Sequence, residues 1–98
     1  MQTYILLTKL SPELLQQMKN REQIGREWLD KVKEKCPDVK FKEHYALLGD
    51  YDFMDIYEAE GEESAAKVSM ISQQHGALHA TSMAAIPYKR FLELAEEI

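Results

Sequence analysis

The sequence predicts one α+β domain, built from a single antiparallel sheet with helices packed on it. Two observations carry this prediction. The chain has 98 residues, which is enough for one hydrophobic core and too few for two. Short apolar or alternating runs and amphipathic runs follow one another as strand, helix, strand, strand, helix, strand, with one more amphipathic run at the end. Residues 1–98 are therefore expected to form a single domain.

The first strand and helix are marked by β-branched residues and by a capping signal. Thr3–Leu10 is apolar without strict alternation, which predicts a strand covered on both faces. Ser11 is a favourable N-cap, and Pro12 suits the first position of a helix. Apolar residues then recur at helical spacing, and Asn20 divides them into a short and a longer helix. The longer helix is expected to end at Cys36, because a proline follows it.

The middle of the chain reads as a β-hairpin. Val39–Leu48 alternates between apolar and polar residues, and Tyr51–Ala59 is rich in aromatic and β-branched residues. Between them, Gly49-Asp50 has the composition of a two-residue hairpin loop.

The last third predicts a helix, a strand and a closing helix. Acidic residues at Glu58–Glu63 precede an apolar stripe in Ser64–Gln74, and Gly76 is a typical C-terminal stop. Ala77–Ile86 is the last predicted strand, and Pro87 opens the closing helix. This order is the ferredoxin-like β-α-β-β-α-β plan with an added C-terminal helix. Right-handed crossovers then give the strand order 4-1-3-2, with both main helices on one face.

Composition limits the class of protein. One cysteine allows no disulfide within the chain, so a reducing cytoplasm is the expected location. No apolar run approaches the ~20 residues of a membrane helix, and a net charge of −5 argues against a nucleic-acid partner. Residues 19–42 carry a local excess of basic side chains, which we interpret as a solvated helix face. A partner-docking face is the alternative.

The predicted hairpin register divides its side chains into two sets. The mostly apolar set is assigned to the helices: Phe41, Tyr45, Leu47, Met54 and Ile56. The other set is aromatic and titratable: Lys42, His44, Ala46, Leu48, Tyr51, Phe53, Asp55 and Tyr57. A face with so many rings is not expected to be open to water. A second copy of the chain is expected to cover it, which would form a homodimeric α/β barrel.

Two segments resemble the GYD domain family. They are the turn Gly49-Asp50-Tyr51-Asp52-Phe53 and the opening Thr3–Glu13, in which a strand leads through Ser-Pro into a helix. The resemblance implies a ferredoxin-like dimeric α/β barrel. Small monooxygenases, haem-handling proteins and muconolactone-isomerase-like enzymes share that architecture. The resemblance does not supply an activity or catalytic residues.

His44 and Asp55 are the candidate catalytic residues. The register places them directly opposite each other, with Cβ atoms ~5 Å apart. A carboxylate beside an imidazole fixes its tautomer and raises its pKa, which prepares a general base. The competing interpretation, which we favour, is a structural cross-strand ion pair.

The remaining site predictions concern the barrel cavity and the turn. Four residues are expected to bind the ligand: Tyr51, Phe53, Tyr57 and His79. Gly49 and Asp52 are expected to shape the turn, with the Asp52 carboxylate accepting hydrogen bonds from loop amides. No metal is predicted, because His44 and His79 would lie on opposite sheet edges, ~14 Å apart. No cofactor is predicted, because the chain has no phosphate-binding glycine motif.

The function predicted first is small-molecule binding by a homodimer, with the cavity between the two sheets. The expected ligand is small and hydrophobic or aromatic, and neither a nucleic acid nor a membrane is an expected partner. One alternative is a cofactor-independent enzyme, isomerase- or monooxygenase-like, that transfers protons through His44 and Asp55. The other is a structural or partner-docking module.

Overall fold

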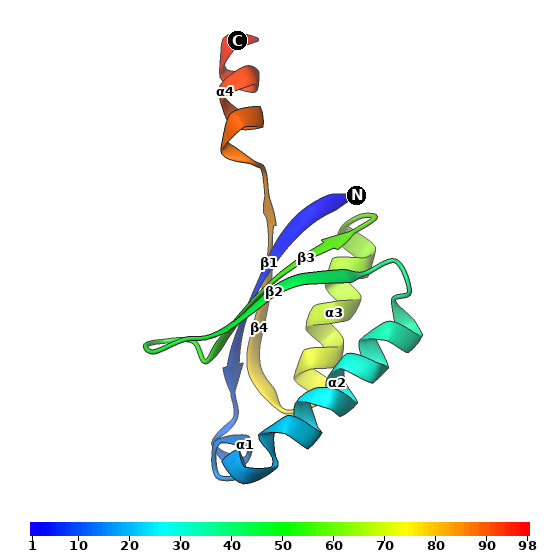
Figure 1. Cartoon of the computed structure of the whole chain (residues 1–98), viewed down its shortest axis with the longest axis vertical. Coiled ribbons are helices and arrows are strands. Elements are labelled where there is room, and N and C mark those ends of the chain that lie inside the picture. Colours follow the sequence, from blue (N-terminus) through cyan, green and yellow to red (C-terminus); the bar gives the residue numbers. More distant parts are fainter.

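The computed structural model describes all 98 residues, and Figure 1 shows the arrangement of its elements. In chain order these are β1 (Gln2–Leu10), α1 (Pro12–Leu15), the 3-10 helix η1 (Met18–Asn20), α2 (Arg21–Lys35), β2 (Lys40–Ala46), β3 (Phe53–Ala59), α3 (Glu62–Gln74), β4 (Ala77–Ala85) and α4 (Tyr88–Glu96). The strands form one antiparallel sheet in the order β2-β3-β1-β4, and α2 and α3 lie on one side of it. The predicted ferredoxin-like fold, strand order and C-terminal helix are confirmed.

The predicted start of α1 is confirmed by a capping contact, whereas α3 begins at Glu62, two residues before the predicted Ser64. The backbone N–H of Leu14 donates to Ser11 Oγ at 3.3 Å, and Pro12 holds the first helical position. The helical run is interrupted at Asn20 and ends before Cys36. Gly76 ends α3 with φ +95°, and a Cβ there would lie 2.5 Å from Leu14 Cδ1. Glycine is therefore required at that turn for both its backbone conformation and its size.

The hairpin loop is longer than predicted. β2 ends at Ala46 and β3 begins at Phe53, so residues 47–52 connect them instead of a two-residue loop. Asp52, the last residue of this connection, is bonded to β1 through both its backbone and its side chain. Its N–H donates to the Thr8 carbonyl at 2.8 Å, and its carboxylate accepts from the Leu10 N–H at 2.7 Å. The Asp52 carboxylate thus accepts from a strand amide and not, as predicted, from loop amides, while its backbone carbonyl accepts from the Leu47 N–H at 2.8 Å.

The predicted register of the hairpin is confirmed near the loop and shifts farther along. His44 lies opposite Asp55, as expected. A bulge then leaves Lys42 without a partner residue, so Phe41 pairs with Tyr57. This shift moves the Phe41 side chain to the same face of the sheet as Tyr57.

The predicted assignment of the two sheet faces is wrong for β3. Burial alternates along this strand, and Asp55, Tyr57 and Ala59 are the buried residues. They face the helices, together with the buried side chains of Tyr4 and Leu6 on β1. On β3 the helices therefore cover Asp55 and Tyr57, whereas Met54 and Ile56 lie on the open face.

Tyr57 explains why the aromatic set faces inward. Its ring stacks on Tyr4 and contacts Phe41, with 5.5 Å between ring centroids in both pairs. Its hydroxyl is 2.8 Å from Ser82 Oγ, so the one polar atom of this fully buried side chain is satisfied. Burial raises the pKa of Tyr57 to about 12. Tyr57 is a core residue, and the prediction that it faces a second subunit is wrong.

The open face of the sheet carries a central row of aliphatic side chains. In the strand register Ile5 lies beside Ile56 and Met83, and Leu7 lies beside Met54. None of the five is fully buried. β1 is therefore covered by helices on one face only, not on both as predicted.

The C-terminal helix makes no core contact. α4 extends away from the sheet in Figure 1 and buries none of its residues. Apolar side chains around it are exposed: Ile86, Tyr88, Phe91, Leu92 and Ile98. None of the helices combines the length and the apolar character needed to cross a membrane.

Candidate functional site

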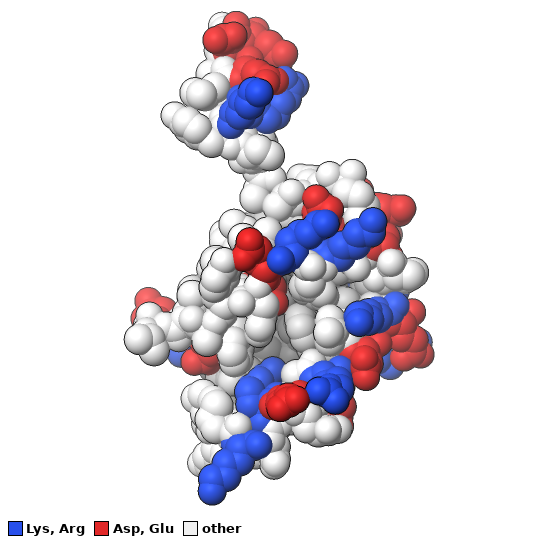
Figure 2. Space-filling model, in the orientation of Figure 1, with Lys and Arg blue, Asp and Glu red and all other residues white.

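A pocket of about 450 Å³ lies between α2 and the helix-covered face of the sheet. Figure 2 shows a hollow in this region, with charged side chains of α2 at its rim. The apolar residues that line it come from β1, α2, β2, β3 and the start of β4: Leu10, Ile24, Trp28, Leu29, Phe41, Phe53 and Ala77. The site therefore lies within one subunit, on the side of the sheet opposite to the predicted barrel cavity.

Trp28 forms one wall of the pocket and is fixed by α3. Its indole Nε1–H donates to Ser72 Oγ at 2.9 Å, and the Ser72 hydroxyl donates to the Val68 carbonyl at 2.9 Å. The indole ring also lies 5.1 Å from the Phe41 ring. These contacts fix the Trp28 ring between α2 and α3. The space beside the ring belongs to the pocket.

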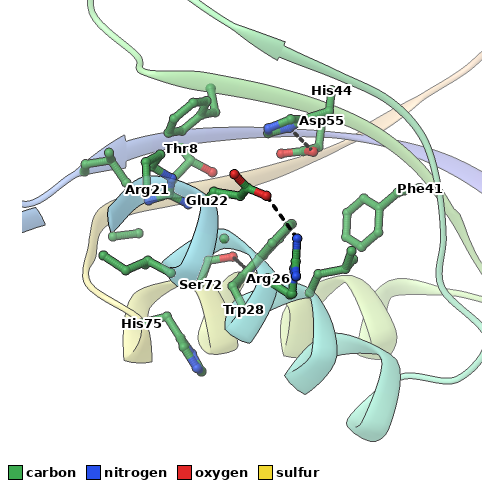
Figure 3. Close-up of a pocket in the computed structure, with 16 residues that line it drawn as sticks. Thr8, Arg21, Glu22, Arg26, Trp28, Phe41, His44, Asp55, Ser72 and His75 are labelled. Atoms are coloured by element: carbon green, nitrogen blue, oxygen red, sulfur yellow. Dashed lines mark hydrogen bonds and ion pairs between the residues drawn. The ribbon is translucent and has the colours of Figure 1, made fainter. Parts of the chain in front are cut away.

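His44 and Asp55 form an ion pair at the sheet side of the pocket (Figure 3). His44 Nδ1 lies 2.5 Å from Asp55 Oδ1. The Asp55 side chain is only 5% exposed, whereas that of His44 is 60% exposed. Burial raises the pKa of Asp55, and the nearby His44 and Arg21 charges act in the opposite direction. When Asp55 is ionised it can only accept, so His44 Nδ1 donates to it and Nε2 remains for another partner.

Arg21 is the charged group of the pocket that sequence reasoning missed. Its guanidinium carbon lies 4.9 Å from the centre of the Phe53 ring, a cation–π contact. Phe53 in turn stacks against His44, with 5.5 Å between ring centroids. Burial lowers the pKa of Arg21, and the Asp55 charge opposes that shift. Arg21, Phe53 and His44 thus form one continuous polar and aromatic end of the pocket.

A signal for Arg21 was present in the spacing of α2. Arg21, Gly25 and Trp28 follow one another at intervals of four and three residues, which places them on one face of the helix. All three line the pocket. An arginine and a glycine on the stripe that faces the sheet are unusual for a packed helix, and they indicate a cavity there.

The other charged side chains of the pocket have partners of their own. Arg26 and Glu22 form an ion pair at 3.1 Å, drawn with a dashed line in Figure 3. His75 donates from Nδ1 to the Ile71 carbonyl at 3.0 Å. Along α2 basic and acidic side chains alternate, as Figure 2 shows. Basic and acidic side chains therefore lie next to one another on the face shown in Figure 2.

The predicted site residues divide into three groups. His44, Asp55 and Phe53 come together in the pocket. Tyr57 lies beneath it in the core, and Tyr51 is outside the pocket lining. His79 is exposed on the open face of β4, opposite Lys9. His44 and His79 are therefore on opposite faces as well as opposite edges of the sheet, and no three His, Cys, Asp or Glu side chains lie close enough to hold a metal together.

The turn residues lie outside the pocket. Gly49 has φ +135°, a conformation that favours glycine, and so shapes the turn as predicted. Asp52 bonds to the end of β1 through the Leu10 amide, and Lys9 Nζ donates to the Asp50 carbonyl at 3.0 Å. These bonds fix the hairpin end against β1, beside the strand segment that carries Phe53 into the pocket.

Comparison with known proteins identifies the domain and the fold. Residues 4–95 match the GYD domain. The chain is similar in structure to FFRP-DM1, with 19% identity, a TM-score of 0.57, and 88% of this chain and 100% of that chain covered. It is also similar to TTHA0845 from Thermus thermophilus (18% identity, TM-score 0.56, 89% and 95% covered). MtbAldR shares 16% identity with a TM-score of 0.58 over 88% of this chain and 53% of that one. No curated protein matches the sequence.

Proposed function

Because the chain belongs to the GYD domain family, and the matched region contains every residue of the pocket, we propose that it binds a small molecule between α2 and the sheet. The observation that carries this proposal is the pocket itself. Its volume of about 450 Å³ falls within the range of ligand sites, which is on the order of 300–1,000 Å³. Most of the surface that lines it is apolar, and Arg21 and His44 both contact the Phe53 ring at the edge of the pocket.

The same proposal includes a homodimer that forms through the open face of the sheet. A partly exposed aliphatic row lies there, formed by Ile5, Leu7, Met54, Ile56 and Met83. Two copies related by a twofold axis can bury such a row against itself. The exposed apolar side chains of α4 are not buried within the chain, and in the dimer they would pack against the second copy. The dimer would cover the face opposite the pocket and leave the pocket within each subunit.

A pocket-filling substitution tests ligand binding. Gly25 lines the pocket, and a Leu side chain there would project into the space beside Arg21. We expect Gly25→Leu to weaken binding of 2-naphthol, a neutral aromatic probe, by about tenfold or more, because the removal of contact area with an apolar ligand costs at least ~1.4 kcal/mol. Trp28 is the only tryptophan, so its indole N–H signal in NMR reports on the pocket without ambiguity.

The matched control is Lys33→Leu, which adds the same side chain to an exposed position of α2 outside the pocket. It should bind the probe as the wild type does, with the same saturable shift of the Trp28 signal. Equal affinities in the Gly25→Leu and wild-type proteins would contradict the proposed site. NMR shifts caused by the probe only at residues of the open sheet face would also contradict the proposed site.

The second candidate function is proton transfer by His44. It is favoured by the His44–Asp55 contact of 2.5 Å at the pocket edge, with most of the imidazole accessible. In such a reaction Nε2 would take a proton from the carbon next to a ligand carbonyl and return a solvent proton to the enolate. This predicts that the protein speeds deuterium incorporation into 2-tetralone in D2O, and that His44→Asn lowers the rate ~10²–10⁴-fold. An unchanged exchange rate in His44→Asn would exclude the enzymatic function for this ketone.

A further inference from the structure

We propose that the ligand of this pocket is an aromatic or aliphatic carboxylate, whose carboxylate group binds the Arg21 guanidinium while its apolar body lies against Trp28 and Phe41. This inference rests on the proposed function and names the class of ligand for the same site. It follows from the partners of the charged groups, from the space beside Arg21, and from the distribution of polar and apolar walls.

Arg21 is the charged group of the pocket without a counter-ion in contact. Of the two carboxylates that line the pocket, Glu22 is paired with Arg26, and Asp55 is paired with His44. Arg21 takes part in none of the six ion pairs of the chain, which are those with N···O distances up to 4.0 Å. An arginine stays protonated in proteins, so this half-buried side chain is a permanent positive charge facing the cavity.

The position of the guanidinium is fixed, and its approach is open. Contact with the Phe53 ring at 4.9 Å holds it at the polar end of the pocket. A Cβ at position 25 would lie 3.4 Å from Arg21 Nη2, so the glycine leaves free the space directly beside the guanidinium nitrogens. A guanidinium with accessible N–H groups binds carboxylates in a bidentate manner, with charge-assisted hydrogen bonds. Thr8, which also lines the pocket, offers a hydroxyl as a further donor.

The rest of the pocket selects the body of the ligand. From Arg21, the α2 face continues one turn on to Ile24 and two turns on to Trp28, and the Phe41 ring lies 5.1 Å from the Trp28 ring. A molecule bound at Arg21 through an anionic group would therefore place its remaining atoms between aromatic and aliphatic side chains. The other polar side chains of the lining already have partners within the chain: Glu22 with Arg26, Ser72 with Trp28 and Val68, and His75 with Ile71. A highly charged ligand such as a nucleotide would therefore find few free partners there.

The test compares two probes of the same shape, 2-naphthoate and 2-naphthamide, by titration calorimetry and by the Trp28 indole signal. The wild type should bind 2-naphthoate at least about tenfold more tightly than 2-naphthamide, since each 1.4 kcal/mol of charge-assisted bonding is a factor of ten. Arg21→Gln should remove this preference and leave the affinity for 2-naphthamide within about twofold of the wild type. Lys31→Gln, which removes a positive charge of α2 outside this pocket, should keep the preference.

Each other outcome overturns a defined part of the account. Equal wild-type affinities for the two probes would refute the carboxylate inference and leave small-molecule binding intact. A preference that survives in Arg21→Gln, or that is lost in Arg26→Gln instead, would show that Arg21 does not bind the anion. If neither probe binds, the proposed function fails together with the inference.

Discussion

His44→Ala is expected to lower the free energy of unfolding by about 1–3 kcal/mol near neutral pH, because it leaves the buried Asp55 carboxyl group without its hydrogen-bond partner. Asp55 is 3% exposed, and His44 lies 2.5 Å from it. Asp55→Asn should cost much less, because the group it leaves behind is an imidazole that is mostly in water. His44→Asn keeps an N–H donor near Asp55 and should fall between the two.

The loss in His44→Ala should depend on pH in one direction. Burial already raises the pKa of Asp55 above its ordinary value of 3.8, and His44 opposes this rise. Without His44 the folded-state pKa of Asp55 rises further. The loss of stability is therefore present at pH values above this folded-state pKa, and it disappears as the pH falls toward 3.8. The stability difference between wild type and His44→Ala should therefore shrink on acidification.

Urea unfolding at fixed protein concentration, near pH 7 and again near pH 4, measures this difference. A stability loss in His44→Ala that is independent of pH would contradict the proposed role of His44 in stabilising the buried Asp55 carboxyl group. Equal losses in His44→Ala and Asp55→Asn would contradict it as well, because the expected asymmetry follows from the unequal exposure of the two side chains.

Ile5→Lys is expected to raise the dissociation constant of the proposed homodimer by about 100-fold or more. Ile5 lies at the centre of the open face, beside Ile56 and Met83 in the register. In an isologous interface each substitution occurs twice, so two buried like charges would face each other across the axis. A factor of 100 corresponds to only about 2.7 kcal/mol, less than the cost of desolvating two unpaired ammonium groups.

Sedimentation at micromolar protein concentration measures this change in the dissociation constant of the dimer. The wild type should sediment as a dimer and Ile5→Lys as a monomer, while Ile5→Val, which keeps a β-branched apolar side chain, should remain a dimer. A wild type that sediments as a single chain at tens of micromolar would refute the dimer, and a dimeric Ile5→Lys would refute this interface. The pocket test with Gly25→Leu is independent of either result.

Local signals were sufficient to predict the order of elements. Ser11 and Pro12 marked the start of α1, a proline after Cys36 marked the end of α2, and the strands followed from short apolar runs. The pairing of His44 with Asp55 was also predictable, since it depends only on counting back from the turn.

The sequence did not reveal which face of β3 meets the helices. Alternation defines two sets of side chains but does not say which set is inside, and the expectation that the more aliphatic set is buried was wrong. Tyr57 can be buried because Ser82 satisfies its hydroxyl, and Asp55 can be buried because His44 is its hydrogen-bond partner. Ser82 lies on β4 and His44 on β2, so the sequence of β3 alone does not contain either partner. The bulge at Lys42 also moved the Phe41 side chain to the helix-covered face.

The location of the pocket is the claim on which the account depends, and a structure of the protein crystallised with 6-bromo-2-naphthol tests it most directly. The account predicts an anomalous bromine peak in each copy between α2 and the sheet, within contact distance of Trp28, Phe41 and Phe53. A peak found only between the open sheet faces of two copies, or no peak at all, would contradict it.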